Sequence, residues 1–173
     1  MIQIKNAAEL QKMRKACAIS AAALKAGGEA IEPGITTAEI DKIIYDFIVR
    51  HGARPNFLHL YGFPATACIS VNDTVIHGIP NKQQQIRPGD IVSIDTGCKI
   101  DGFNGDNACT YACGKIDLEA QRLLDVTKES LHRGIEMACG GNRVGDIGHA
   151  VQSYVEENGF SVVRTFVGHG VGK

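Results

Sequence analysis

Hydrophobic residues recur at helical spacing in four stretches of the chain. These stretches predict helices over residues 7–27, 36–52, 117–138 and 145–158. Gly27 and Gly28 predict the end of the first helix. Thr36, followed three residues later by Glu39, predicts a capping box that starts the second helix.

Shorter runs rich in β-branched residues predict strands over residues 66–72, 91–96, 106–113 and 160–167. The second and third of these strands flank a Gly-rich segment, Thr96–Gly105, which we interpret as a loop. The predicted helices and strands indicate an α+β fold. A length of 173 residues is typical of a single domain.

The chain resembles itself after a shift of 107 residues. At this offset Ile147 aligns with Ile40, Val151 with Ile44, Tyr154 with Phe47 and Gly159 with Gly52, and in the preceding helices Gly134 aligns with Gly27 and Gly141 with Gly34. Two amphipathic helices align by chance easily, but shared glycines in the same register favour a true repeat. Lys173 corresponds to residue 66 of the first copy, so we expect the second copy to lack the later strands.

Two aspartates flank the Gly-rich segment. In an antiparallel hairpin, Asp95 is expected directly opposite Asp106, on the same face. Like charges so placed need a shared proton or a bridging cation. The alternative is a register shifted by one residue, which sends the two side chains to opposite faces.

Two histidines lie in settings that suit chemistry. His169 stands between glycines in Gly168-His169-Gly170, which leaves its imidazole accessible to a metal or a substrate. His77 ends an apolar run closed by Gly78 and Pro80, and it could be a buried structural histidine or a substrate contact. Carboxylates with imidazole, and no Gly-x-Ser-x-Gly motif, favour metal-assisted hydrolysis with Mn, Fe, Co or Zn.

The composition argues against nucleic-acid binding and indicates where the protein is located. The net charge is −1, aromatic residues make up 6% and Trp is absent, which argues against direct reading of nucleic acid. No apolar run is long enough for a membrane span and the N-terminus lacks signal-peptide features, so we expect a cytoplasmic protein. Its six cysteines include no C-x-x-C pair, which indicates free thiols in a reducing compartment.

Three segments together resemble the type I methionine aminopeptidases. They are Ile91-Val92-Ser93-Ile94-Asp95-Thr96-Gly97, Asp101-Gly102-Phe103-Asn104-Gly105-Asp106 and Phe166-Val167-Gly168-His169-Gly170-Val171-Gly172. Val71-Asn72-Asp73 through His77-Gly78-Ile79-Pro80 fits the same family. The resemblance implies the pita-bread (creatinase/aminopeptidase) fold, with pseudosymmetric halves over residues 1–114 and 115–173, the second half incomplete.

The resemblance also implies site roles. Asp95, Asp106 and His169 are expected to bind up to two divalent ions, and His77 to contact the substrate near the scissile bond. Phe57, Phe63 and Cys68 are expected in the methionine pocket, and Tyr61 departs from the His or Asn usual in the family. The expected substrates are the N-termini of nascent polypeptides, with the ribosome as a candidate partner.

The family carries two further ligand glutamates after the Gly-His-Gly motif. Residues 1–173 supply three of the five ligands, so we expect this chain to be catalytically incomplete. One alternative is an inactive pita-bread half that binds a polypeptide or a partner chain. Another is a proline-type peptidase of the same fold, although those usually carry a large N-terminal domain.

Overall fold

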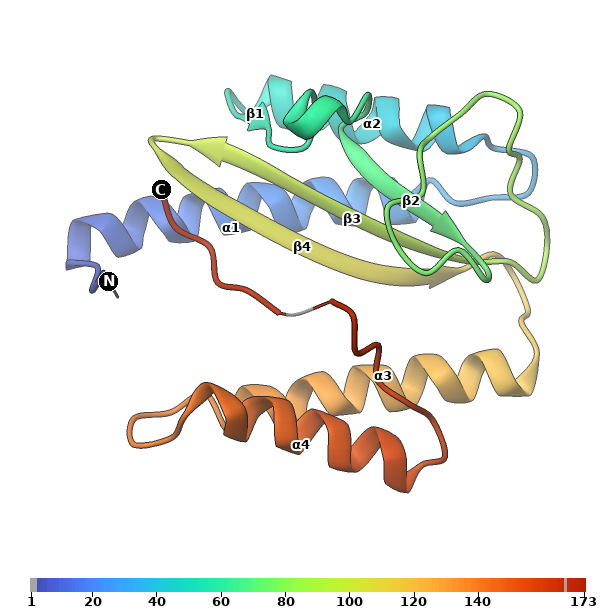
Figure 1. Cartoon of the computed structure of the whole chain (residues 1–173). Coiled ribbons are helices and arrows are strands. Elements are labelled where there is room, and N and C mark those ends of the chain that lie inside the picture. The colour runs from blue at the N-terminus through green and yellow to red at the C-terminus, as the bar shows by residue number, and fades with distance from the viewer. Residues whose placement is uncertain (1–2, 167) are drawn as a thin grey trace. The chain divides into compact units, whose positions relative to one another are not determined.

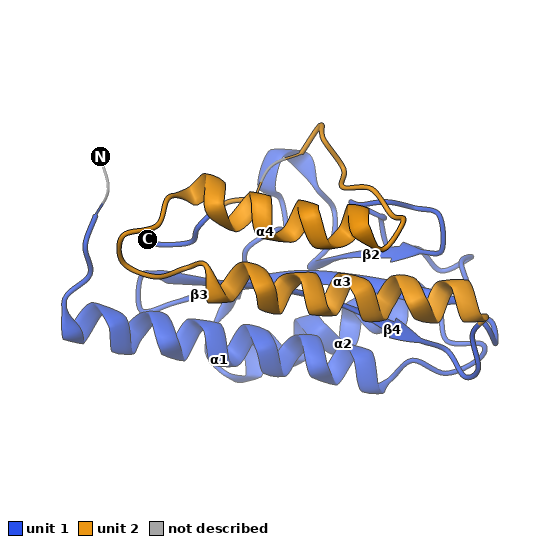
Figure 2. Ribbon diagram, turned by 90° about the horizontal axis from the view of Figure 1, so that it is seen from below, with its two compact units in different colours: residues 1–116, 170–173 blue, residues 117–169 orange. Residues whose placement is uncertain are grey.

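The computed structural model describes residues 3–166 and 168–173, which divide into two compact units. The first unit spans residues 1–116 and 170–173, and the second spans residues 117–169 (Figure 2). We describe each unit by itself. The predicted halves, residues 1–114 and 115–173, stay a prediction.

The first unit packs two helices against one face of an antiparallel sheet (Figure 1). Its elements are α1 (Ala7–Glu29), α2 (Thr37–Arg50), β1 (Arg54–Pro55), the 3₁₀ turn η1 (Leu60–Gly62), β2 (Ala67–Val71), β3 (Ile91–Ile100) and β4 (Phe103–Ala112). β3 is central: it pairs with β4 along its length and with β1 and β2 at successive positions. The predicted α+β class is confirmed.

The core lies between α2 and the sheet. The stripe Ile40, Ile44 and Ile48 is fully buried, as its helical spacing predicts. It packs in one cluster with Val92 and Ile94, two alternate residues of β3. Alternation in β3 therefore leaves Ser93, Asp95, Gly97 and Lys99 on the opposite face of the sheet.

The predicted end of the first helix is wrong. α1 continues through Gly27 and Gly28, both buried. A Cβ on Gly27 would lie 2.7 Å from Ile44 Cδ1, and one on Gly28 would lie 2.1 Å from the Tyr111 ring. These glycines allow close packing against α2 and β4 rather than ending the helix. The capping box that starts α2 is confirmed: Thr36 Oγ1 accepts from the Glu39 amide, and the Glu39 carboxylate accepts from the Thr36 amide.

The segment 96–105 is not a loop. Both strands extend through it and meet at a two-residue turn, Asp101-Gly102, in which both residues have positive φ. Asp-Gly favours this turn type, whose twist suits a tight hairpin. The sequence prediction did not identify Asp101-Gly102 as the turn. This turn sets the register of the hairpin and makes both strands longer than predicted.

The second unit is a helical hairpin of α3 (Leu118–Glu136) and α4 (Val144–Glu157). The strand predicted over residues 160–167 is wrong for residues 160–166, and residue 167 lies outside the described residues. A strand requires a hydrogen-bonded neighbour, and no described strand pairs with this segment.

The 107-residue repeat is confirmed in the helices of the two units. Shifting α2 by this offset reproduces the bounds of α4, and α1 and α3 end at matching residues. A Cβ on Gly27 would meet Ile44 and Ile40, and one on Gly134 would meet Val151 and Ile147, the residues one repeat later. Gly34 and Gly141 share a left-handed conformation, with φ of 97° and 99°.

Candidate metal and peptide site

Two carboxylates lie on the open face of the β3–β4 hairpin. The predicted register is wrong by two residues: Asp106 lies opposite Gly97, and Asp95 lies opposite Ala108. A shift of two residues preserves the face, so Asp95 and Asp106 are diagonal neighbours on the same side of the sheet. The prediction that Asp95 and Asp106 lie on the same face is confirmed. The prediction that they lie directly opposite each other is wrong.

Cys68 lies beside this carboxylate pair. On β2 it is directly opposite Asp95, and its side chain is buried. Burial, followed by the negative charges of Asp95, Asp106 and Asp41, raises the pKa of the Cys68 thiol to about 12. Both carboxylates thus act electrostatically on one buried thiol, which places their negative charges close together.

The segment before η1 lies over the same face. The Asn56 amide donates to the Gly97 carbonyl at 2.9 Å, which ties this segment to β3. A Cβ on Gly97 would lie 3.2 Å from Asn56 Nδ2 and 3.3 Å from Phe57 Cε1. Phe57, half-buried, therefore lies next to the residue that faces Asp106.

Phe63 closes the turn that follows. Its carbonyl accepts from the His59 amide at 2.8 Å, and its own amide donates to the Leu60 carbonyl. His59 and Tyr61 both adopt a left-handed backbone, uncommon for residues with a Cβ. The structure thus places Phe57 and Phe63 at the two ends of one tight turn, and Cys68 at the start of β2.

His77 is exposed on a loop held against β2. The Ile69 amide donates to the Gly78 carbonyl at 2.8 Å, and the Gly78 amide donates to Ser70 Oγ at 3.1 Å. A Cβ on Gly78 would lie 2.1 Å from the Ile69 carbonyl oxygen, so only glycine permits this approach. His77 itself has a φ of 56°. The loop therefore fixes His77 beside the strand that carries Cys68.

Asp41 of α2 is a supporting residue that the sequence analysis missed. Its Oδ1 accepts from the amides of Thr66 and Ala67, at 2.9 and 2.8 Å, and so anchors the start of β2. Burial raises the pKa of the Asp41 carboxyl above its usual value, against the lowering effect of these two bonds. No sequence signal marks Asp41, because its partners are backbone groups some 25 residues away.

His169 belongs to the second unit, where it is exposed. In the described part of the chain, no group of three or more His, Cys, Asp or Glu side chains is placed to hold a metal ion. The carboxylate pair fits a divalent cation through its oxygen donors and its negative potential. The place of His169 in the ligand set stays a prediction.

Comparisons with known proteins match nearly the whole chain. The model of metallopeptidase family M24 matches residues 11–173. A methionine aminopeptidase of Clostridium perfringens is 51% identical over 173 residues, which are 100% of this chain and 69% of that protein. One from Bacillus subtilis is 46% identical over the same length.

Solved structures agree with the sequence matches. Methionine aminopeptidase from Rickettsia prowazekii has a TM-score of 0.96 at 39% identity, covering 99% of this chain and 69% of that one. Aminopeptidase P of Escherichia coli, at 23% identity and a TM-score of 0.78, shares the fold alone. The predicted pita-bread fold is thereby confirmed, and the proline-type alternative has the weaker match.

Proposed function

This chain belongs to metallopeptidase family M24, among the methionine aminopeptidases, and we propose that it removes the N-terminal methionine from polypeptides in a metal-dependent reaction. The observation that carries the proposal is the hairpin face on which Asp95 and Asp106 are diagonal neighbours beside Cys68 and Phe57. Carboxylates on one face serve a metallopeptidase, whereas a pure binding module has no need of them. The binding-fragment alternative is not favoured.

Asp95, Asp106 and His169 would hold divalent metal, with Mn, Fe, Co and Zn as the candidates and two ions as the largest number. When bound, such an ion lowers the pKa of water and polarises a carbonyl group. The carboxylates provide hard oxygen donors and offset the ionic charge. The two acids share one face, and their mutual repulsion would favour binding of a divalent ion between them.

The apolar groups define where the substrate side chain lies. Phe57, Phe63 and Cys68 would line the methionine pocket, because their surfaces suit an unbranched thioether. The high pKa keeps the Cys68 thiol neutral, so it acts as a small apolar wall and not as a nucleophile.

His77 would bind the substrate near the scissile bond. It would donate a hydrogen bond to the oxygen that gains charge as the peptide bond is attacked. The bonds of Gly78 to β2 anchor the backbone next to His77, which reduces the cost of ordering this loop during the reaction.

The substrates would be the N-termini of nascent polypeptides, which makes the ribosome a candidate partner. The cytoplasm is the proposed location, and the six cysteines, all free in the structure, suit its reducing conditions. Among the described residues, no helix is both long enough and apolar enough to cross a membrane.

The test is release of methionine from a Met-Ala-Ser peptide by the 173-residue chain, with added Mn²⁺ or Co²⁺. Asp106→Asn removes a proposed ligand, and Asp101→Asn at the exposed hairpin turn is the matched control. We expect release that depends on metal, is lost in Asp106→Asn and persists in Asp101→Asn. No release from a folded chain with metal present would contradict the proposed activity, and release that persists in Asp106→Asn would contradict the proposed role of Asp106.

A further inference from the structure

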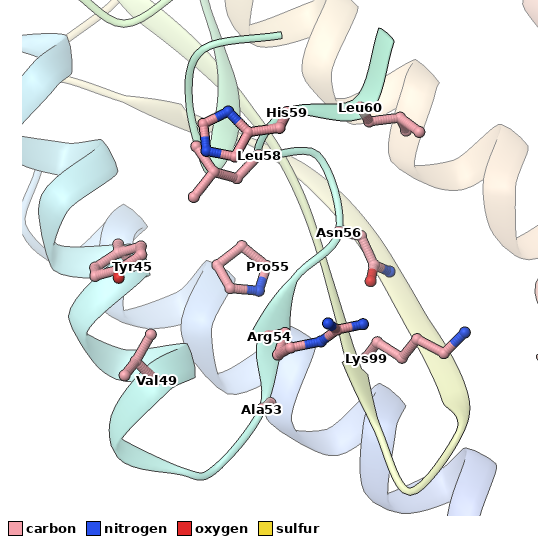
Figure 3. Close-up of a pocket in the computed structure, with 10 residues that line it drawn as sticks. All are labelled: Tyr45, Val49, Ala53, Arg54, Pro55, Asn56, Leu58, His59, Leu60 and Lys99. Atoms are coloured by element: carbon pink, nitrogen blue, oxygen red, sulfur yellow. The ribbon is translucent and has the colours of Figure 1, made fainter. Parts of the chain in front are cut away.

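Arg54 and Lys99 form an unusual pair of like charges. They are directly opposite each other in the β1–β3 ladder, an arrangement that destabilises a sheet. Lys99 is half-buried, and its neighbour on β4 is the neutral Asn104. Figure 3 shows both cationic side chains extending toward the same side, with the Lys99 ammonium farther out than the Arg54 guanidinium.

Among the described residues, no acid forms an ion pair with Arg54 or Lys99. The acids nearby in sequence are engaged elsewhere: Asp101 pairs with Lys15 at 2.8 Å, and Asp46 pairs with Lys42 at 2.6 Å. Neither Arg54 nor Lys99 forms an ion pair or a side-chain hydrogen bond with a residue that the structure describes. Asp106 is a diagonal neighbour of Lys99 on the same face and offsets part of the positive charge, but two adjacent cations that form no ion pair still provide a site for an anion from outside the chain.

An apolar hollow adjoins the two cations. It has a volume of about 620 Å³, within the usual range of ligand sites, and Arg54 and Lys99 belong to its lining. Figure 3 shows Tyr45 and Val49 of α2 across β1 from the cations, with Pro55 between. Tyr45 is 38% exposed and Val49 is 46% exposed, so an apolar group has open surface to cover.

The lining favours a peptide over a nucleic acid. A nucleic-acid surface needs many cations to neutralise successive phosphates, whereas this chain has a net charge of −1 and the hollow has two strong cations, Arg54 and Lys99. Its apolar wall is mostly aliphatic, and its two aromatic rings, Tyr45 and His59, are too few for a series of stacking platforms. A carboxylate fits the planar guanidinium of Arg54 in a two-pronged contact, and Lys99 adds a second positive charge.

We propose that Arg54, Lys99 and the adjoining hollow form a docking site for an acidic peptide segment of another protein. One Asp or Glu side chain binds between the two cations, and a neighbouring aliphatic side chain packs against Val49 and Pro55. This site lies outside the residues proposed for methionine removal, and it stands or fails independently of that reaction.

The test is a titration of the ¹⁵N-labelled chain with an acetylated peptide of sequence Gly-Glu-Leu-Glu-Leu-Gly, followed by amide chemical shifts. The acetyl group prevents the peptide from acting as an aminopeptidase substrate. We expect saturable shifts at residues 45–60 and around Lys99, weakening as salt is added. A matched peptide with Gln in place of Glu is expected to bind at least about tenfold more weakly, as loss of a charge-assisted contact implies.

Two variants complete the test. Arg54→Gln with Lys99→Gln is expected to weaken binding at least about tenfold, and Lys12→Gln with Lys25→Gln makes the same charge change on α1 as a control. The amide spectrum of each variant reports whether it remains folded. Should the acidic peptide cause no shifts, should the Gln peptide bind equally, or should a twelve-nucleotide uridine RNA bind here in its place, the proposal is overturned.

Discussion

Phe57 Cε1 lies 3.3 Å from the position that a Cβ on Gly97 would occupy. Gly97 is in turn directly opposite Asp106, so the absence of a side chain at residue 97 lets an aromatic ring lie next to the carboxylate face. The position of Phe57 in the proposed methionine pocket therefore depends on one glycine of β3.

Substituting this glycine is expected to impair substrate binding. In Gly97→Ala the new methyl group would lie 3.3 Å from Phe57 Cε1, so the ring must shift slightly, and it would lie 3.0 Å from the Gly105 carbonyl oxygen on the other strand. We expect kcat/KM for a Met-Ala-Ser peptide to fall on the order of tenfold, mainly through KM, because small displacements near a site are costly. Gly148→Ala in α4, where a Cβ meets nothing within 4 Å, is the control; equal KM values for the two variants would contradict the pocket.

Replacing His77 is expected to affect the chemical step. Asn tolerates the left-handed backbone that His77 adopts, so His77→Asn should keep the loop in place. Loss of a hydrogen bond made in the transition state predicts a fall in kcat of about 10²-fold with little change in metal affinity. Steady-state kinetics together with a metal titration measure both; an unchanged kcat would remove His77 from the reaction.

Asp41 is expected to control stability through its two backbone partners. Asp41→Ala leaves the buried amides of Thr66 and Ala67 without their acceptor, which costs about 1–3 kcal/mol in the free energy of unfolding. In Asp41→Asn the amide oxygen can still accept both bonds, so we expect stability at pH 7 to equal or exceed that of the unmodified chain. Urea denaturation measures both variants, and equal losses would contradict this account.

Asp41 is also expected to make the free energy of unfolding depend on pH. Because folding raises the pKa of Asp41, the native state binds more protons than the unfolded chain between the usual value of 3.8 and the raised one. This contribution to stability is present below that window and is lost as pH rises through it. We therefore expect Asp41→Asn to gain stability relative to the unmodified chain as pH increases from 3.5 to 7. A difference that is constant over this range would rule out the proposed cause.

Gly105 allows α1 and β4 to pack closely. A Cβ at this residue would lie 2.4 Å from the Ala16 carbonyl oxygen and 2.8 Å from the Cys17 amide nitrogen, both backbone atoms of α1. A helix backbone cannot move out of the way by changing rotamer, as a side chain can. We therefore expect Gly105→Ala to lower the free energy of unfolding by about 1–3 kcal/mol or more. Gly145→Ala, in open space on α4, is the control, and thermal denaturation distinguishes them.

Local signals in the sequence predicted the helices and their starts well. The stripe Ile40, Ile44 and Ile48 and the capping pair Thr36 and Glu39 act within a few residues, so spacing alone reveals them. The repeat extended this success, since the close contact at Gly27 recurs at Gly134.

Features set by distant contacts were harder to predict. Gly27 and Gly28 looked like a helix end, because their packing partners Ile44 and Tyr111 are remote in sequence. The hairpin register was misjudged because Asp101-Gly102 was not taken as the turn, although it carries the signal. Asp41 was missed because its role depends on where β2 begins in space.

The central claim is that the open face of the β3–β4 hairpin binds divalent metal, and calorimetric titration of the chain with Mn²⁺ tests it most directly. We expect saturable binding that weakens at least about tenfold in Asp95→Asn and in Asp106→Asn, since even loss of an indirect partner of a metal site costs about 10- to 100-fold. Asp101→Asn, at the turn of the same hairpin, should bind like the unmodified chain. Mn²⁺ binding that is equal in all four proteins, or absent from the folded unmodified chain, would contradict the account.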